Sequence, residues 1–164
     1  DLACGVGYGS YMIANQTECS AVQAVDLSSE AIDYANKYYS NSKISYVQGD
    51  CFEVPLEHQR FDVCISFETV EHIPDDLRLL KRFYAALKPE GKLILSTPNQ
   101  QEMPFSPEKF PFHCKHYLPE ELESLISQAG FVIEAVTAQK DKKIGDITPG
   151  WEGKFNLLVC KKKR

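Results

Sequence analysis

Three glycines within the first nine residues constrain the fold of this chain more than any other stretch. Residues 1–10 read DLACGVGYGS, and a helical pattern follows them. Glycine enters left-handed backbone conformations without a Cβ penalty and lets another molecule approach the main chain closely. A glycine turn that leads into a helix presents free N–H groups and the positive end of the helix dipole. The stretch therefore predicts a binding turn for an anionic or strongly polar ligand.

The spacing of these glycines discriminates between nucleotide ligands. A dinucleotide-binding fingerprint has the form Gly-x-Gly-x-x-Gly after a strand. Here Ser10 stands where the third glycine is expected after Gly5 and Gly7, and Gly9 is out of step. The carboxylate of Asp1, just ahead of the turn, would repel a pyrophosphate and attract an ammonium group. We therefore expect a ligand with a cationic group near the turn.

Four stretches resemble, in order, the motifs of the class I S-adenosylmethionine-dependent methyltransferases. The first is the Asp-x-Ala-x-Gly-x-Gly-x-Gly pattern, and residues 49–51, 61–73 and 87–99 resemble the later ones. Glu90 replaces the first glycine of the Pro-Gly-Gly turn that the family usually has. Alone, the glycine pattern also fits a surface turn without a ligand. The whole resemblance implies a Rossmann-like fold, and S-adenosylmethionine as the methyl donor.

Composition and charge place the chain among ordinary globular domains. It has 164 residues, 43% of them hydrophobic, and a net charge of −5, so nothing global favours nucleic-acid or membrane partners. The basic residues 161–164 are interpreted as a solvated tail. Six scattered cysteines without a Cys-x-x-Cys pair indicate free thiols in a reducing, cytoplasmic compartment. No transmembrane or signal segment is visible in the sequence.

Strand and helix patterns alternate along most of the chain. The pattern predicts a doubly wound α/β sheet, mostly parallel, with an antiparallel C-terminal strand pair at its edge. The chain opens inside a motif that normally follows a strand, so we expect a single, N-terminally truncated methyltransferase domain over residues 1–164 that lacks its first strand. Strands are expected at 21–25, 43–47, 61–67, 92–96, 131–136 and 155–160, with helices at 9–18, 28–39, 74–87 and 119–130, a turn at 88–91 and an irregular segment at 98–118.

The residues that end successive strands are candidates for cofactor binding, because ligands of such sheets bind beyond the carboxyl ends of the strands. Asp26 can accept hydrogen bonds from both hydroxyls of a ribose, or it can cap the following helix. The family resemblance implies that Asp50 takes the adenine amino group and Cys51 a ring nitrogen; a turn-forming Gly-Asp is the alternative. The predicted cofactor residues are Asp1, Gly5, Gly7, Asp26, Leu27, Asp50, Cys51 and Phe67, and Pro98 lies at a further strand end.

Two carboxylates and an imidazole follow the 61–67 strand. Glu68, Glu71 and His72 would share one face of a helical turn, and such ligands suit a divalent ion such as Mg²⁺, Mn²⁺ or Zn²⁺. The spacing is similar to that of small-RNA 2′-O-methyltransferases and quinone-biosynthesis O-methyltransferases. In the small-RNA enzymes, a further histidine comes from a loop after the Ser-Thr-Pro-Asn strand. His113 matches that histidine best, and His116 is the second candidate. The predicted metal ligands are therefore Glu68, Glu71, His72 and His113.

The metal is not the only interpretation of this stretch. Ile73 replaces a second histidine of the small-RNA form, and the chain lacks a basic surface for RNA. The carboxylates can instead be a solvated pair at a helix start, with His72 as a catalytic base or as a structural histidine. The aromatic residues Phe105, Phe110, Phe112 and Trp151 either line an acceptor pocket or cover the sheet.

The favoured function is methyl transfer to a small polar acceptor, by O-methylation, with a sugar-like molecule as the leading candidate. Two other functional classes stay open at this point. One is a nicotinamide-dependent oxidoreductase of Rossmann layout, against which Asp1, Gly9 and Asp50 argue. The other is a catalytically silent scaffold that keeps the methyltransferase fold.

Overall fold

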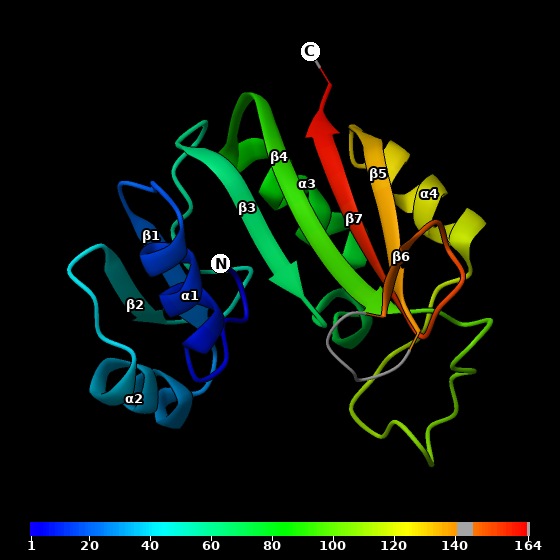
Figure 1. Cartoon of the computed structure of the whole chain (residues 1–164), viewed down its shortest axis with the longest axis horizontal. Coiled ribbons are helices and arrows are strands. Elements are labelled where there is room, and N and C mark those ends of the chain that lie inside the picture. The colour runs from blue at the N-terminus through cyan, green and yellow to red at the C-terminus, as the bar shows by residue number, and fades with distance from the viewer. Residues whose placement is uncertain (141–145, 164) are drawn as a thin grey trace. The chain divides into compact units, whose positions relative to one another are not determined.

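A computed structural model describes residues 1–140 and 146–163 and divides the chain into two compact units (Figure 1). The first unit comprises Asp1–Pro55 and the second Leu56–Arg164. Each unit has its own sheet, so the described strands form two hydrogen-bonded sheets where the sequence predicted one. No helix among the described residues is long and apolar enough to span a membrane.

The first unit is a small α/β layer. Its elements are α1 (Tyr8–Gln16), β1 (Val22–Asp26), α2 (Ser29–Tyr38) and β2 (Ile44–Gln48). The two strands pair in parallel, with Val22 opposite Ile44. The chain start also runs parallel to β1, because Val25 donates its N–H to the Asp1 carbonyl and accepts from the Cys4 N–H. The glycine turn is thereby fixed to the carboxyl end of β1.

The boundaries of the two helices of this unit agree well with those predicted from the sequence. Ser28 caps α2, since its hydroxyl accepts a hydrogen bond from the backbone N–H of Ala31. The helix α1 ends at Gln16, two residues before the predicted end, because Thr17 adopts an extended backbone. The core of this unit consists of small and branched side chains; its buried hydrophobic members are Leu2, Ala14, Ala24, Val25, Ile32, Ala35 and Val54.

In its described residues, the second unit forms a five-stranded mixed sheet with two α-helices. Its strand order is β3-β4-β7-β5-β6, with β3 and β4 parallel and the other neighbours antiparallel (Figure 1). This confirms the predicted α/β fold with antiparallel C-terminal strands. Its elements are β3 (Phe61–Phe67), the 3₁₀ turn η1 (Val70–His72), α3 (Asp76–Ala86), β4 (Leu87–Pro98), α4 (Pro119–Gln128), β5 (Phe131–Gln139), β6 (Ile147–Pro149) and β7 (Phe155–Lys162).

The position of the antiparallel pair differs from the prediction. The last strand β7 lies between β4 and β5, and the short β6, which the sequence did not reveal, is outermost. The predicted solvated tail is also wrong in part, because β7 continues through Lys162. The buried Lys162 ammonium donates a hydrogen bond to the Leu87 carbonyl. Arg164 lies outside the described residues.

Two boundaries in the middle of the second unit needed correction. The helix α3 begins at Asp76 rather than at Pro74, because Asp75 caps it by accepting from the Arg78 N–H. The predicted turn at 88–91 lies inside β4, where the ladder with β3 shifts register. Glu90 has φ +66° in this bulge, a conformation for which glycine is usual. The irregular segment contains no helix or strand between Asn99 and Leu118, as predicted.

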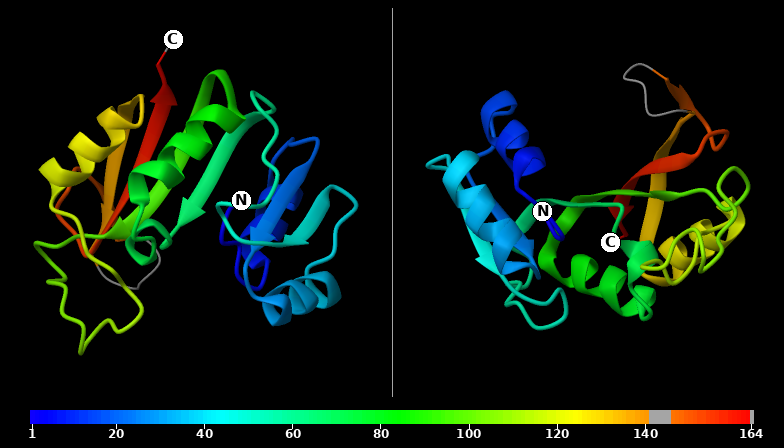
Figure 2. Two further views of the ribbon diagram at one scale, coloured as in Figure 1. Left: turned by 180° about the vertical axis from the view of Figure 1, so that it is seen from behind. Right: turned by 90° about the horizontal axis from the view of Figure 1, so that it is seen from below.

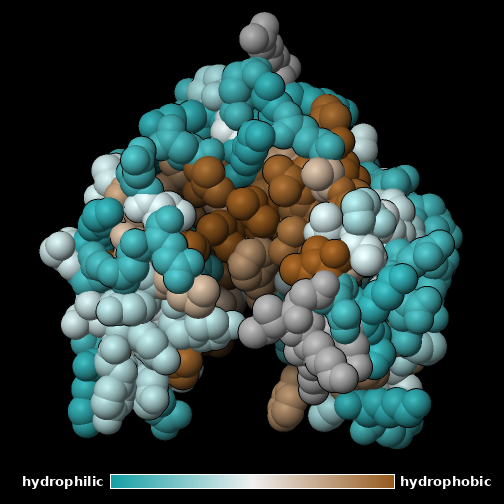
Figure 3. Space-filling model, in the orientation of Figure 1, coloured by the Kyte–Doolittle hydropathy of each residue, from teal (hydrophilic) through white to brown (hydrophobic). Residues whose placement is uncertain are grey.

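The helices α3 and α4 cover one face of the five-stranded sheet (Figure 2). The side chains of Leu93, Leu95, Leu158 and Cys160 are fully buried on this face. Alternate residues of the same strands face the other way, so Leu157 and Val159 of β7 are only half-buried. Figure 3 shows apolar side chains gathered over the middle of this second face. We call it the open face of the sheet.

Candidate functional site

The glycine turn has the backbone that the sequence predicted. Gly5 and Gly7 have φ +55° and +85°, and Gly7 is the N-cap of α1. A Cβ on Gly7 would lie 2.6 Å from the Cβ of Ala35, whereas a Cβ on Gly5 or Gly9 would meet nothing within 4 Å. Gly7 is thus required by packing, and Gly5 and Gly9 border open space. Together with the first-turn N–H groups of α1, this space suits a closely bound polar ligand.

Asp26 links the glycine turn to the end of β1. Its Oδ2 accepts a hydrogen bond from the Gly5 N–H at 2.8 Å, and its Oδ1 accepts from the Ser28 N–H at 2.9 Å. The carboxylate therefore has a structural role, although Ser28 and not Asp26 is the N-cap of α2. An ionised carboxylate has about four acceptor sites, so acceptor capacity remains for ribose hydroxyls.

The other predicted cofactor residues of the first unit lie around the same strand ends. Asp1 accepts a hydrogen bond from the Ser10 hydroxyl at 2.6 Å, so its carboxylate lies beside the first turn of α1. The Gly49 N–H donates to the Asp26 carbonyl at 2.9 Å and joins the ends of β1 and β2.

Four further residues, at or just after the ends of strands, complete the set. Asp50 accepts from the Phe52 N–H at 2.7 Å, which is the turn geometry of the alternative interpretation. Cys51 beside it is half-buried, and Leu27 is 66% exposed, which leaves its apolar side chain free for a ring. Phe67, also exposed, lies in the second unit at the end of β3.

The second unit contains a cluster of three possible metal ligands. One ligand atom each of Glu71, His72 and His113 lies within 4.8 Å of the others. Glu71 is fully buried; its Oε2 accepts from the Thr97 hydroxyl at 2.9 Å, and its Oε1 has no hydrogen-bond partner among the described residues. Burial raises the pKa of Glu71 to about 7, against the opposing hydrogen bonds of its own backbone and of Thr97. A buried carboxylate oxygen without a partner is costly, and a cation would satisfy it.

Hydrogen bonds to backbone carbonyls orient the imidazoles of this cluster. His72 Nδ1 lies 2.7 Å from the Phe112 carbonyl, and His116 Nδ1 lies 2.5 Å from the Met103 carbonyl. A carbonyl only accepts, so both Nδ1 atoms carry the proton. His116 Nε2 is then the acceptor for His113 Nδ1 at 2.8 Å. With these hydrogen bonds, the Nε2 lone pairs of His72 and His113 stay free, as metal ligation requires.

The electrostatic surroundings favour neutral imidazoles in the loop. Partial burial, followed by the nearby His72 and His116, lowers the pKa of His113. Burial likewise lowers the pKa of His116, although its hydrogen bond to the Met103 carbonyl opposes the shift. Neutral imidazole is the form that binds metals. The preference for His113 over His116 as the candidate ligand thus agrees with the placement of the two rings.

Glu68 does not belong to this cluster, in contrast to the expected shared helical face. It has φ +49°, and only residues 70–72 form a 3₁₀ turn, so the right-handed helical spacing is interrupted. Its Oε1 accepts from the Ser96 hydroxyl at 2.6 Å. The residue retains exposed surface. Desolvation of the carboxyl group, followed by the charge of Glu71, raises its pKa to about 7, against the Ser96 hydrogen bond and His72.

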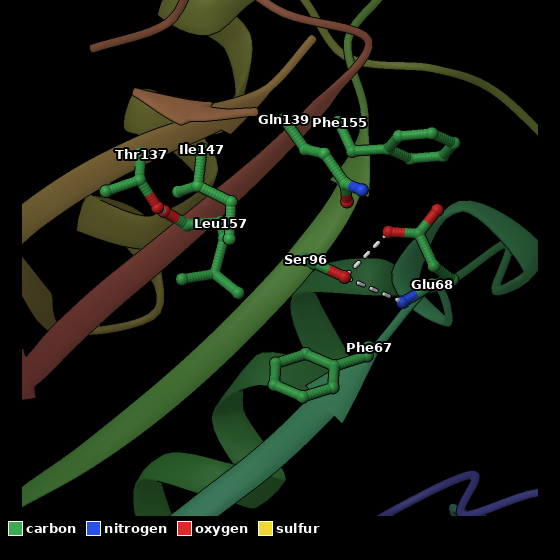
Figure 4. Close-up of a pocket in the computed structure, with 8 residues that line it drawn as sticks. All are labelled: Phe67, Glu68, Ser96, Thr137, Gln139, Ile147, Phe155 and Leu157. Carbon is green, nitrogen blue, oxygen red and sulfur yellow. Dashed lines mark hydrogen bonds between the residues drawn. The ribbon is translucent and has the colours of Figure 1, made fainter. Parts of the chain in front are cut away.

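The four aromatic residues, assigned from the sequence either to an acceptor pocket or to cover of the sheet, lie in different surroundings. The Phe110 ring packs 5.2 Å from His113 and the Phe105 ring 5.6 Å from His116, so both shape the histidine cluster. Phe112 is 82% exposed, and the Trp151 carbonyl accepts from buried Asn99. None of them lines the cavity of about 270 Å³ that lies on the open face (Figure 4). Its lining residues are Phe67, Glu68, Ser96, Thr137, Gln139, Ile147, Phe155 and Leu157.

Sequence reasoning missed the roles of two residues in the Ser-Thr-Pro-Asn stretch. Ser96 donates to Glu68 and Thr97 donates to Glu71, so each of two consecutive hydroxyls on β4 holds one of the two carboxylates. A signal for this existed in the parallel pairing of adjacent strands, since Phe67 lies opposite Ser96. Recognising it required the register of the two strands.

Comparison with known proteins gives consistent matches. A family model for a methyltransferase domain matches residues 1–95. Over 138 residues the chain is 34% identical to a protein of Mycobacterium tuberculosis named a probable S-adenosylmethionine-dependent methyltransferase, covering 80% of this chain and 47% of that protein. It is also 33% identical to the ubiquinone biosynthesis O-methyltransferase of Coxiella burnetii over 103 residues, covering 61% of this chain and 43% of that enzyme. The chain spans about half the length of these curated relatives.

Solved structures share the fold at low sequence identity. An S-adenosylmethionine-dependent methyltransferase from Mesorhizobium loti superposes with a TM-score of 0.81 at 19% identity, covering 99% of this chain and 89% of that one. The [4+2]-cyclase SpnF superposes with a TM-score of 0.77 at 16% identity, covering 99% of this chain and 74% of that one. The same fold therefore occurs with a different named reaction, and the residues of the site have to decide the chemistry.

Proposed function

Because this chain belongs to the class I S-adenosylmethionine-dependent methyltransferases, we propose that it transfers a methyl group from S-adenosylmethionine to an oxygen atom of a small acceptor. The observation that carries this proposal is the open glycine turn fixed to the end of β1 by Asp26. Relatives named as O-methyltransferases, including the malonyl-[acyl-carrier protein] O-methyltransferase of Priestia megaterium (34% identity over 97 residues, 59% of this chain and 35% of that enzyme), support oxygen as the methylated atom. The family match runs from residue 1 to 95, across both compact units, which supports the prediction of one methyltransferase domain.

The first unit supplies the residues proposed to hold the methyl donor. Gly5 and Gly7 let the main chain approach it, and Asp26 accepts the ribose hydroxyls with its remaining lone pairs. Asp50 and the Cys51 N–H bind the adenine. The other members of the proposed set are Asp1, beside the charged amino-acid end, and the apolar side chain of Leu27; Phe67, which the sequence added to the set, belongs to the second unit.

When bound, the donor supplies a sulfonium methyl group, whose C–S bond breaks with its electron pair returning to sulfur. The chain's residues have to orient the acceptor oxygen and take up its proton. His72 is the proposed base when no metal is present, because the Phe112 carbonyl holds its Nδ1 proton and leaves Nε2 basic. Its tautomer is thereby suited to receive a proton.

The same cluster supports a second role for His72. We propose that Glu71, His72 and His113 bind a divalent metal ion, because the orphaned Oε1 of Glu71 and two free Nε2 lone pairs are close together. When bound, such an ion would polarise an acceptor hydroxyl and lower its pKa, so that a weaker proton acceptor, such as solvent, could take up the proton. Glu68, which the sequence placed among the ligands, is left out of this set.

Calorimetric titration of the purified protein with S-adenosylhomocysteine and, separately, with NADH tests the donor. We expect saturable binding of S-adenosylhomocysteine and none of NADH. The reverse result would favour the nicotinamide-dependent alternative. Binding of S-adenosylhomocysteine without methyl transfer to any compound of a broad acceptor screen would favour a silent scaffold.

A further inference from the structure

We propose that the cavity on the open face of the five-stranded sheet is the acceptor-binding pocket, and that the acceptor combines a flat apolar body, such as a benzene ring, with a hydroxyl group held at Glu68. This inference rests on the proposed function and names the substrate class for it. The pocket lies entirely within the second unit.

The register of the sheet explains why these residues share one pocket. Phe67, Ser96, Leu157 and Thr137 are direct cross-strand neighbours on β3, β4, β7 and β5. Phe155, Gln139 and Ile147 form the next row, on β7, β5 and β6. Residues directly opposite in a ladder point to the same face, and so do residues two apart on one strand. The pocket floor is thus built by main-chain pairing and is present before any ligand binds.

The lining chemistry favours an apolar body. Phe67, Phe155, Leu157 and Ile147 give carbon surface, and Phe67 and Ile147 are 46% and 61% exposed, so a bound ring would remove apolar area from water. A cavity of about 270 Å³ suits a molecule with one ring and a short substituent. A sugar would bring several hydroxyls against the carbon surface of these four side chains, and burying hydroxyls without partners is unfavourable. The pocket therefore argues for an apolar acceptor over the sugar-like one favoured by the sequence.

Polar groups lie at specific places in this lining. The Ser96 hydroxyl donates to Oε1 of Glu68 and so fixes the carboxyl group at the edge of the pocket (Figure 4). Among the described contacts the second oxygen, Oε2, has no donor, which leaves it for the hydroxyl of an acceptor. Gln139 and Thr137 add polar atoms on the β5 side. A few oriented polar groups in an apolar cavity are what fixes the orientation of a small ligand.

Isothermal titration with three probes tests the substrate class: 4-propylphenol, its methyl ether 4-propylanisole, and methyl α-glucopyranoside. We expect 4-propylphenol to bind, 4-propylanisole to bind about fivefold to tenfold more weakly because it lacks the donor for Glu68, and the glucoside not to bind. Glu68→Gln should reduce the difference between phenol and ether, because a neutral amide oxygen is a weaker acceptor than a carboxylate. Binding of the glucoside in place of the phenol would overturn the proposal.

A matched pair of variants tests the location. Ile147→Asp puts a charge at the exposed rim of the pocket and should weaken 4-propylphenol binding about tenfold. Val132→Asp makes the same change at a residue that is 48% exposed on β5 and does not line the pocket, and should leave binding within about twofold. Equal binding by both variants would overturn the pocket assignment. Titration of the same samples with S-adenosylhomocysteine separates the two proposals. If 4-propylphenol binds and S-adenosylhomocysteine does not, methyl transfer is refuted while the assignment of the pocket and its ligand class stands.

Discussion

The backbone N–H of Gly5 donates a hydrogen bond to the carboxylate of Asp26 at 2.8 Å, across 21 positions of sequence. With the Ser28 N–H on its other oxygen, Asp26 joins the glycine turn, the end of β1 and the start of α2. The residue proposed to hold the ribose therefore also maintains the turn that would receive the donor. Substitution of Asp26 should change both stability and affinity.

Asp26→Asn replaces one acceptor oxygen by an NH₂ group, so one of the two N–H donors loses its partner. We expect a loss of about 1–3 kcal/mol in the free energy of unfolding and at least about tenfold weaker binding of S-adenosylhomocysteine. Urea denaturation and calorimetry measure the two effects. Asp33→Asn, at an exposed position of α2, is the control and should change stability by less than about 0.5 kcal/mol. Unchanged affinity in Asp26→Asn would count against the ribose role.

Gly7 and Gly9 should respond differently to alanine. Gly7→Ala combines a φ of +85° with a Cβ only 2.6 Å from Ala35, so we expect destabilisation by about 3 kcal/mol. Gly9 lies inside α1 with open space around its Cβ position, and Gly9→Ala should be neutral or stabilising by about 0.5–1 kcal/mol. Thermal unfolding followed by circular dichroism compares them. Similar melting temperatures for the two variants would show that the turn repacks.

Metal binding can be tested by stripping the protein with a chelator and reloading it with Mn²⁺ or Zn²⁺. Elemental analysis should find one equivalent in the wild type, and at least about tenfold weaker binding in Glu71→Gln and His113→Ala. His116→Ala should weaken binding as well, because the His113 tautomer loses its acceptor.

Glu68→Gln is the matched control for the metal set, since Glu68 contacts Ser96 instead of the cluster. It should retain the metal. Equal loss in Glu68→Gln and Glu71→Gln would restore Glu68 to the ligand set. A wild type that binds no metal and keeps its activity in chelator would leave His72 as the base.

The free cysteines should differ in reactivity toward iodoacetamide. Burial raises the pKa of Cys64 to about 11 and that of Cys160 to about 12 by disfavouring the charged thiolate. At pH 8 about one Cys64 side chain in a thousand, and fewer of Cys160, would be thiolate, and access is restricted too. Cys114 is exposed and should be alkylated first. Peptide mass spectrometry over a time course checks the order, and early labelling of Cys64 would contradict the burial of β3.

Asn99 connects the irregular segment to the loop before β7. It is fully buried, and its amide donates to the carbonyls of Trp151 and Gly153 at 2.9 and 3.0 Å. Asn99→Ala leaves those carbonyls without this donor and should cost about 2–4 kcal/mol in urea denaturation. Asn15→Ala, at an exposed position of α1, should cost less than about 0.5 kcal/mol. Equal costs would show that water replaces the Asn99 contacts.

Much of the fold was predictable because its signals are local. Ser28 caps α2 by a hydrogen bond to a residue of the first turn of that helix, and Gly7 has a positive φ that glycine adopts easily. Residues 61–67 are apolar enough to be recognised as a strand. Local signals failed where a distant strand decided the outcome. The order β4-β7-β5 places the last strand inside the sheet. The three-residue β6 is a strand because it pairs with the edge of β5.

The sequence by itself was enough to locate the turns and helix caps, because these depend on neighbours along the chain. It also fixed which residue types stand at the strand ends, and these indicated the methyltransferase family. Tertiary structure decided which of these side chains act together. The left-handed φ of Glu68 separates it from Glu71, and the irregular segment brings His113 and His116 to His72. The pairing of β3, β4, β7 and β5 brings Phe67, Ser96 and Leu157 into one pocket. Strand register and loop closure join residues that are far apart in the chain, and spacing along a sequence carries no direct record of such pairings.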